Sequence, residues 1–345
     1  MPQRARWRVE GLRHWEAASV ACLHDILLGL QAPGTQSNEH AKAGVMMAVG
    51  AYGWWAIITP LYYRAVEDVP LGELLAWRAI SGLPALLLML WAMKQLPAWW
   101  AALRTPRVLG LLAVSAVLIS VNWIVFIWAV MDNRLSEASL GYYINPLVSV
   151  ALGMLVLGER LRKTQWIAIT LASVGVAVLA WRLGGLPWIS LTLAGSFGLY
   201  GLVRKQVDAG PAVGLAVEMF LVLPFMFVLL WFDHVEHGNA VLAGPWLTSV
   251  LLLCGGVVTI APLVLFAGCV KRLRLSTVGL LQYIAPSGQL ILAVLVFNEP
   301  FGTDRMMAFL FIWAAVVVYS IDSIRHAKLM AINAKLMAIS IPGEA

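Results

Sequence analysis

Two segments of the chain read alike: RLSEASLGYYINPLVSVALGMLVLGE at residues 134–159 and RLSTVGLLQYIAPSGQLILAVLVFNE at residues 274–299. They agree at eleven of 26 positions without a gap, and the shared residues include an arginine, a tyrosine, a proline and a glutamate, which common hydrophobicity does not supply. A shift of 140 residues relates the two segments, and the same shift places Pro84 on Pro224 and Phe126 on Phe266. We infer that the chain contains two copies of one unit.

The composition places both copies in a membrane. Hydrophobic residues make up 61% of the 345 residues and charged residues only 12%, against about 45–50% and about 25% in soluble domains. These values exclude a soluble enzyme, a nucleic-acid-binding protein and a disordered scaffold. Charges and turn formers divide the chain into ten apolar segments, each near the roughly 20 residues that cross a bilayer: 44–63, 73–93, 108–131, 136–157, 165–182, 187–203, 213–232, 246–270, 275–297 and 304–324. The expected fold is an all-α integral membrane protein with ten transmembrane helices.

The number of helices in each copy predicts how the copies are arranged. Five is an odd number, so the second copy enters the membrane from the opposite side and the two copies form inverted repeats. The predicted divisions are a cytoplasmic tail that is poorly ordered or carries a surface helix (1–42), a first repeat (43–182), an inverted second repeat (183–325) and a second cytoplasmic tail (326–345). Inverted repeats are typical of transporters in which one half moves against the other around a site at the middle of the bilayer.

The positions of lysine and arginine predict the orientation of the helices. Cations near helix ends are retained on the cytoplasmic side. With the N-terminus in the cytoplasm, nineteen of these residues fall on the inner side, among them Arg204, Lys205, Lys271 and Arg272, and only four on the outer side. Both termini are therefore expected to be cytoplasmic.

Several short runs resemble a known family. They are EASLGYYINPLV (137–148), LGER (157–160), LYGLVRK (199–205), RLRLST (272–277) and QYIAP (282–286). Together they are similar to the RarD branch of the EamA family, in the drug/metabolite transporter superfamily, over roughly residues 43–325. The resemblance implies a ten-helix permease of the bacterial inner membrane. The label of this branch, chloramphenicol-sensitive protein, names a phenotype and not a cargo.

Prolines in the fourth and ninth segments predict the substrate site. Proline removes a backbone donor from a helix, and the freed carbonyl groups must be buried in protein or face a water-filled cavity. We expect helix breaks at Pro146 and at Pro286, its partner under the 140-residue shift. The alternative is that each proline makes a packing kink, whose freed carbonyl groups are satisfied by neighbouring helices. The candidate substrate-binding residues near these prolines and on the facing helices are Trp54, Asn122, Trp123, Tyr142, Tyr143, Asn145, Gln282 and Tyr283.

Two ionisable residues lie inside predicted helices. Arg78 and Glu218 are partners under the 140-residue shift, but their helices run in opposite directions and roughly 15 Å of helix axis separates them. We expect no direct pairing, and assign both residues to coupling or gating, with Glu218 as the candidate for proton coupling. The alternatives are that Arg78 reaches the outer headgroups and that Glu218 makes a structural hydrogen bond.

The predicted function is secondary transport. Aromatic walls with few polar groups suit amphipathic small molecules and attract organic cations, so we expect a carrier of small metabolites or drugs that exchanges them for protons. Export, as opposed to import, is implied by the family resemblance alone. A passive facilitator and an intramembrane enzyme acting on lipids remain alternatives. No phosphate-binding loop of the GxxxxGK[ST] type occurs. We expect no cofactor, metal or nucleic acid, contact with membrane lipid, and a monomer or homodimer.

Overall fold

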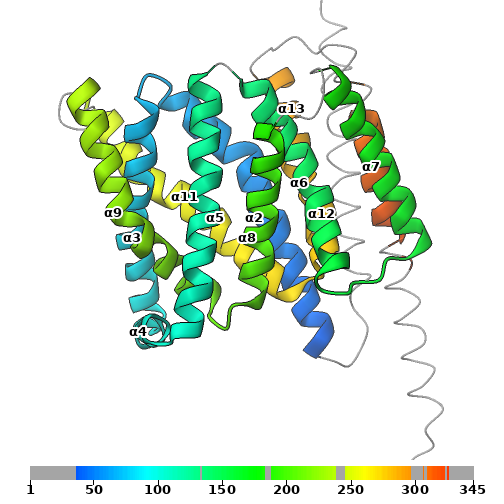
Figure 1. Cartoon of the computed structure of the whole chain (residues 1–345), viewed down its shortest axis with the longest axis horizontal. Helices are drawn as coiled ribbons and strands as arrows, with labels where there is room; N and C mark the ends of the chain where they lie inside the picture. The colour runs from blue at the N-terminus through cyan, green and yellow to red at the C-terminus, as the bar shows by residue number, and fades with distance from the viewer. Residues whose placement is uncertain are drawn as a thin grey trace, which may run out of the picture.

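The computed structural model describes residues 36–132, 134–182, 188–237, 245–296 and 309–322, together with residues 306 and 325. Its regular elements are all helices (Figure 1). They are α2 (Gln36–Ala65), α3 (Leu71–Ala92), α4 (Leu96–Arg104), α5 (Pro106–Met131), α6 (Leu135–Leu155), α7 (Lys163–Arg182), α8 (Trp188–Gln206), α9 (Pro211–His237), α11 (Trp246–Arg272), α12 (Leu275–Leu281), α13 (Ile284–Leu295) and a helix at Phe309–Asp322.

Eight stretches of the described chain are long and apolar enough to cross a bilayer, with α12 and α13 counted together as Leu275–Leu295. Helix α8 and helix Phe309–Asp322 occupy the sixth and tenth predicted segments, but neither is among the eight. The prediction of an all-helical, multi-pass membrane protein is therefore confirmed at the level of eight candidate spans.

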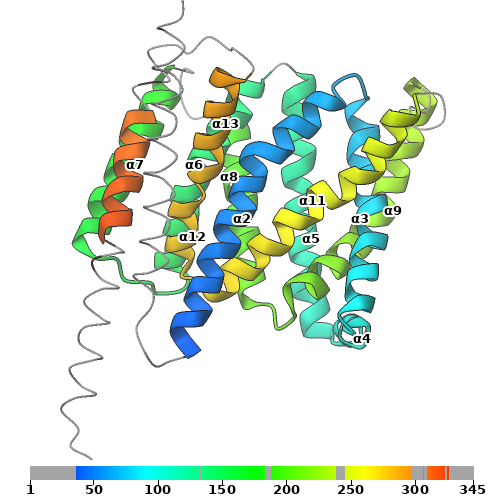
Figure 2. The ribbon, with the colours of Figure 1, turned by 180° about the vertical axis from the view of Figure 1, so that it is seen from behind.

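The helices pack so that segments far apart in the sequence lie side by side. Helix α2 crosses α11, and α13 packs on α2 (Figure 2). Helix α3 packs between α9 and α11, and α8 packs between α5 and α6. Helix α7 and helix Phe309–Asp322 lie together at one edge of the bundle, where small residues of α7 meet Ile312 and Ala315. Within the described residues, helices from the first and second halves of the chain thus pack against one another.

Two boundaries differ from the prediction. The first helix begins at Gln36 and not near residue 44, and an ion pair between Glu39 and Lys42 (2.8 Å) lies in its added turns. Helix α4 was not predicted, because its nine residues are too few to span a bilayer. It lies across the end of the bundle (Figure 1), with Trp99 buried and Trp100 exposed. Residues 1–35 and 326–345, which hold most of the predicted tails, lie outside the described residues.

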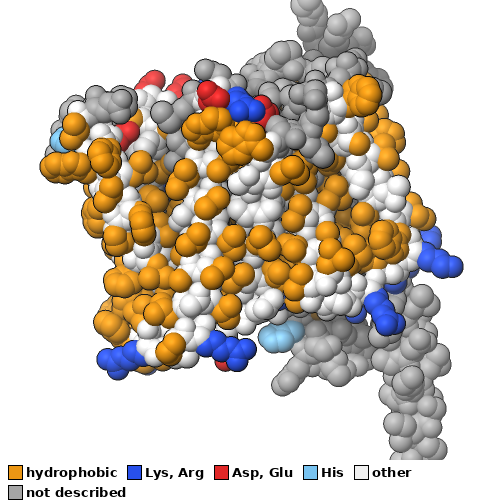
Figure 3. Space-filling view, viewed as in Figure 1, with side chains coloured by type: hydrophobic (Ala, Val, Ile, Leu, Met, Phe, Trp, Pro, Cys, Tyr) orange, Lys and Arg blue, Asp and Glu red, His pale blue; other side chains and the backbone are white. Residues whose placement is uncertain are grey.

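Charge is distributed unevenly along the bundle axis. Most of the visible lysine and arginine side chains gather at the end that carries α4, and most of the visible acidic side chains gather at the opposite end (Figure 3). The surface between the two ends is apolar, with exposed side chains such as Phe225, Phe227 and Trp231. Such a band between two polar ends is the surface that a bilayer requires.

Candidate functional site

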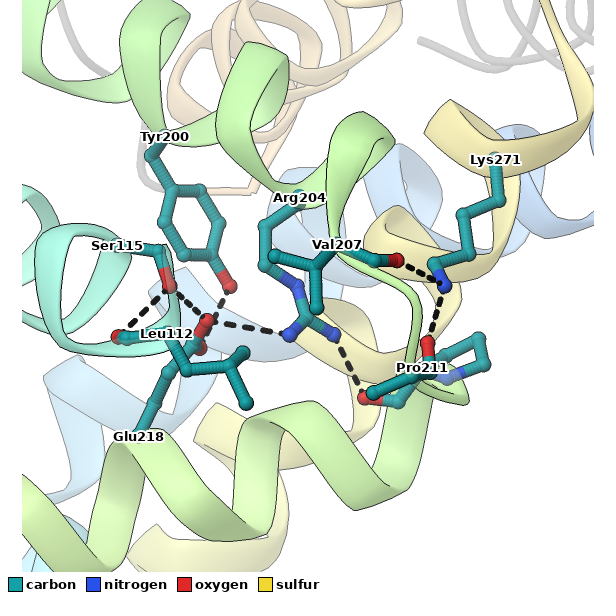
Figure 4. Close-up of polar contacts among 9 residues, drawn as sticks. Leu112, Ser115, Tyr200, Arg204, Val207, Pro211, Glu218 and Lys271 are labelled. Atoms are coloured by element: carbon teal, nitrogen blue, oxygen red, sulfur yellow. Dashed lines mark hydrogen bonds and ion pairs between the residues drawn. The ribbon is translucent and has the colours of Figure 1, made fainter. Parts of the chain in front are cut away.

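A buried ion pair lies near the α4 end of the bundle. Glu218 of α9 accepts hydrogen bonds from the Tyr200 hydroxyl (3.2 Å), from Nη1 of Arg204 (3.2 Å) and from the Ser115 hydroxyl. Nη2 of Arg204 donates to the Pro211 carbonyl at 2.8 Å (Figure 4). The side chains of Arg204 and Glu218 are both 0% exposed. We call Ser115, Tyr200, Arg204 and Glu218 the Glu218 cluster.

Local sequence spacing builds the Glu218 cluster. Tyr200 and Arg204 are four residues apart on α8 and therefore share one face of that helix. Gly214 lies one turn before Glu218 on α9, and a Cβ atom there would lie 2.0 Å from Nη1 of Arg204. Glycine at position 214 thus makes the space that the guanidinium occupies.

The position of Arg204 corrects the sequence analysis, which counted it among the inner loop cations. The sixth helix was predicted to end at residue 203, but α8 continues to Gln206 and holds Arg204 inside the bundle. Removing it from the count leaves eighteen cations on the inner side against four on the outer side, so the predicted asymmetry is unchanged. The prediction missed the pair because Arg204 and Glu218 lie on different helices, whose relative placement the sequence alone does not give.

Two lysines join helix ends beside the Glu218 cluster. Lys205 of α8 donates to the carbonyl groups of Val270 (2.9 Å) and Leu273, at the end of α11. Lys271 of α11 donates in return to the carbonyl groups of Val207 (2.9 Å) and Ala209, just after α8 (Figure 4). Each lysine satisfies carbonyl groups that a helix end leaves without partners. The lysines therefore fasten α8 to α11 at this end of the bundle.

A second polar cluster surrounds Arg78 of α3. Nε of Arg78 donates to Oγ1 of Thr259 on α11 and Nη1 donates to the Tyr63 hydroxyl on α2, both at 2.7 Å. The guanidinium also lies over the ring of Trp123 on α5, 5.1 Å from its centroid. Tyr142 of α6 is close enough to interact electrostatically with Arg78 and Tyr63. We call these five residues the Arg78 cluster.

The Arg78 side chain points into the bundle. Its contacts come from three other helices, and no route to the lipid headgroups is needed to explain them. The cluster is also more open than the Glu218 cluster, because Arg78 and Tyr63 are partly exposed and Tyr142 is 40% exposed. Arg78 and Glu218 each contact different partners, as their predicted separation requires.

A third cluster lies where the ninth segment breaks. Helix α12 ends at Leu281 and α13 begins at Ile284. Between them, Oε1 of Gln282 accepts a hydrogen bond from Ser149 (3.4 Å), and the Tyr283 hydroxyl donates to the carbonyl of Tyr143 (3.2 Å). Tyr143 and Tyr283 are partners under the 140-residue shift, so the two repeats meet at equivalent residues.

Two features of this third cluster bear on ligand binding. Gly279 lets α12 approach α6, since a Cβ atom there would lie 2.6 Å from the Pro146 carbonyl oxygen. Oδ1 of Asn145 and Nε2 of Gln282 are buried, and neither makes a hydrogen bond within the described part of the chain. Buried polar atoms without partners are costly. The arrangement thus leaves one acceptor and one donor available near the middle of α6.

The fourth and ninth predicted segments differ at their prolines. The ninth segment is divided, and Pro286 lies in the first turn of α13, where a missing N–H group has no helical partner to lose. The prediction for Pro146 is wrong, because α6 continues through it from Leu135 to Leu155. A proline removes a single hydrogen bond from the helix, and packing against α8 and α12 holds the rest of α6 together.

The remaining candidate residues, Asn122 and Trp54, form hydrogen bonds between helices. Asn122 donates to the Leu193 carbonyl and to the Ser196 hydroxyl, both at 3.0 Å, and so joins α5 to α8. Trp54 donates to the Val258 carbonyl at 3.1 Å and joins α2 to α11. The residues that sequence reasoning missed are Tyr63, Ser115, Arg204 and Thr259. Within the described residues, no group of three or more His, Cys, Asp or Glu side chains is placed to hold a metal ion.

Comparisons with known proteins show which family this chain resembles. Residues 42–181 match the EamA-like transporter family. A protein of Vibrio cholerae named as an uncharacterized transporter is 41% identical, covering 84% of this chain and 96% of its own length. Protein RarD of Escherichia coli is 40% identical, covering 83% and 96%. A solved crystal structure that is 20% identical superposes with a TM-score of 0.61 over 82% of this chain and 98% of its own, which shows a shared fold.

Proposed function

Because this chain belongs to the EamA-like transporter family and is a relative of the RarD proteins, we propose that it is a ten-helix secondary transporter that works by alternating access. Its cargo is a small amphipathic metabolite or drug, which it exports across the bacterial inner membrane in exchange for protons. The relatives are named as transporters, which favours transport over the enzymatic alternative.

Helix packing supports the inverted repeat. If each helix is exchanged for its partner in the other repeat, the α2–α11 pair becomes α8–α5, the α6–α8 pair becomes α13–α2, and the α3–α11 pair becomes α9–α5, all of which are packed pairs. The α3–α9 and α6–α12 pairs map onto themselves. The contact between Tyr143 and Tyr283 lies at such a self-paired position. This pattern is expected of two units related by a two-fold axis in the membrane plane.

The distribution of charge supports a cytoplasmic position for both termini. Cations concentrate at the end of the bundle that carries α4 (Figure 3), and cytoplasmic ends carry the excess of lysine and arginine. With this orientation the Glu218 cluster lies toward the cytoplasm and the Arg78 cluster toward the outside.

One observation carries the proposal: the two clusters differ in how closed they are. The Glu218 cluster is fully buried beneath the Lys205 and Lys271 contacts, whereas the Arg78 cluster is partly exposed. A carrier that is closed at the cytoplasmic end and open at the other end has this appearance. In the second state of the carrier, the cytoplasmic end would be open and the outer end closed. Protonation of Glu218 would remove the charge that holds Arg204, and so weaken the closed end. This gives Glu218 its role in coupling.

Reconstituted protein tests this function. Liposomes with an acidic lumen are offered four radiolabelled probes: neutral chloramphenicol, anionic hydrocinnamate, neutral hydrocinnamamide and cationic phenylpropylammonium. We expect at least one to accumulate beyond its level in protein-free liposomes, and a protonophore to abolish the difference. Glu218→Gln should lose this accumulation, and Gly195→Ala, whose added methyl group meets nothing within 4 Å, should retain it. Equilibration without accumulation would indicate a facilitator, and undiminished accumulation by Glu218→Gln would remove proton coupling through this residue.

A further inference from the structure

Within the described residues, no carboxylate forms an ion pair with Arg78. Among the described residues, the carboxylates that form ion pairs do so with Lys42, Arg64, Arg134, Arg162 and Arg204. Arg78 has only neutral partners in this part of the chain, namely two hydroxyl groups and two aromatic rings. A cation within a membrane is unfavourable unless it is paired or serves a pathway. Arg204, the cation of the Glu218 cluster, is paired.

The guanidinium retains an unused donor. Nε and Nη1 of Arg78 make the bonds to Thr259 and Tyr63, and within the described residues Nη2 makes none. A guanidinium held at two of its nitrogens has a fixed orientation, and its planar fork matches a carboxylate. The residue is partly exposed.

The aromatic rings of this cluster disfavour a cationic ligand. The guanidinium already lies over the rings of Trp123 (5.1 Å) and Tyr63 (5.9 Å), and these are the faces that attract a cation. A second positive charge here would meet the first at short range. Aromatic walls alone would attract organic cations, but the position of Arg78 among these rings favours an anion instead.

We propose that Arg78 binds the carboxylate of an anionic, amphipathic substrate, whose apolar body lies against Trp123 and Tyr142. This inference rests on the proposed transport function and names its substrate class. Tyr142 and Asn145 are three residues apart on α6 and share one face of it. The buried, unpaired Oδ1 of Asn145 is therefore placed to accept a hydrogen bond from a polar group further along the substrate.

Ligands that differ only in charge test the proposal. The purified full-length protein is mixed with hydrocinnamate, hydrocinnamamide or phenylpropylammonium, and its unfolding temperature is measured, because a ligand that binds the native state raises it. We expect hydrocinnamate alone to stabilise the wild type. Arg78→Gln should weaken hydrocinnamate binding about tenfold or more, since a charge-assisted hydrogen bond is lost. Arg78→Lys should be intermediate, because lysine keeps the charge without the planar fork.

Arg64→Gln is the matched control. Arg64 lies at the end of α2, is paired with Glu67 at 3.5 Å, and belongs to no part of the Arg78 cluster, so this variant should bind hydrocinnamate like the wild type. The proposal is overturned if the amide or the ammonium compound binds as tightly as the carboxylate. It is equally overturned if Arg78→Gln, checked as folded by gel filtration, binds like the wild type, or if none of the compounds binds at millimolar concentration.

The outcome is separable from that of the proposed function. Suppose that chloramphenicol or phenylpropylammonium accumulates in liposomes and that binding does not depend on the charge of the ligand. This result would support the transport function and exclude the anion site. Charge-selective binding that depends on Arg78, without accumulation of any of the four probes, would leave the anion site and remove the transport mechanism.

Discussion

The Arg78 cluster and the Glu218 cluster occupy the same place in the two repeats and carry opposite central charges. Each central residue is the eighth residue of its helix, α3 or α9, and these two helices pack against each other in opposite directions (Figure 1). One cluster is buried and neutral as a whole, because Arg204 pairs with Glu218. The other is partly exposed and keeps its positive charge. The 140-residue shift therefore pairs two ionisable residues whose partners differ.

A pair of arginines shows the same divergence. Arg64 and Arg204 are also related by the 140-residue shift. Arg64 lies at one end of the bundle with its side chain 66% exposed beside Glu67, and Arg204 is fully buried beside Glu218. Equivalent residues therefore differ in solvent access between the two ends.

Loss of the buried cation should have the largest effect on stability. Arg204→Met removes the partner of Glu218 and leaves a carboxylate in the core without a counter-ion, a change that typically costs about 3–5 kcal/mol. Unfolding of the purified protein by titration with sodium dodecyl sulfate measures the loss. Arg64→Met, the equivalent change at the open end, should cost no more than about 1 kcal/mol because exposed ion pairs contribute little.

A double variant separates charge from shape. Arg204→Met combined with Glu218→Gln removes both charges from the core, and should recover much of the stability that Arg204→Met loses. A double variant no more stable than the single one would mean that the fit of the Arg204 side chain, and not its charge, holds this end together.

A methyl group at position 214 should have the next largest effect. In Gly214→Ala the new Cβ atom would lie 2.0 Å from Nη1 of Arg204, so the guanidinium must move away from Glu218. Overpacking of this kind typically costs about 1–3 kcal/mol. Gly195→Ala on α8 adds the same methyl group where no atom lies within 4 Å, and by helix propensity it should gain up to about 1 kcal/mol. Equal stabilities for the two variants in the same titration would show that the cluster tolerates displacement of Arg204.

The membrane-spanning helices of this fold were predictable because each needs roughly 20 apolar residues to cross the bilayer. The second predicted segment, 73–93, matches α3 (Leu71–Ala92) within two residues, and the fifth, 165–182, matches α7 (Lys163–Arg182) equally well. Helix α4 escaped prediction because it does not cross the bilayer. The continuity of α6 through Pro146 escaped as well, since it depends on the helices that flank it.

Only those site residues that the 140-residue shift relates to each other were predictable from the sequence. The shift pairs Arg78 with Glu218 and Tyr143 with Tyr283. It could not identify Thr259 or Ser115 as partners, because those contacts depend on where α11 crosses α3 and where α5 crosses α9. Arg204 was misassigned for a similar reason, as a cation near a helix end can face water or turn inward.

The two lysine contacts at the closed end should contribute less than the ion pair. Lys205→Met and Lys271→Met each remove hydrogen bonds to two carbonyl groups, and each should cost about 1 kcal/mol. Amide hydrogen exchange after α8 and at the end of α11 should become faster in both variants. Lys163→Met, which changes an exposed lysine at the start of α7, is the control and should leave exchange at both places unchanged.

Arg78→Gln is expected to have the smallest effect on stability, although its inferred effect on substrate binding is the largest. Arg78→Gln removes two hydrogen bonds to hydroxyl groups, but it also removes a positive charge that no described carboxylate neutralises. These contributions have opposite signs, so the net change in unfolding free energy should lie within about 1 kcal/mol. The same titration measures it beside Arg204→Met. A loss as large as that of Arg204→Met would mean that Arg78 is held by a counter-charge of its own, and the contrast between a neutral closed cluster and a charged open one would no longer stand.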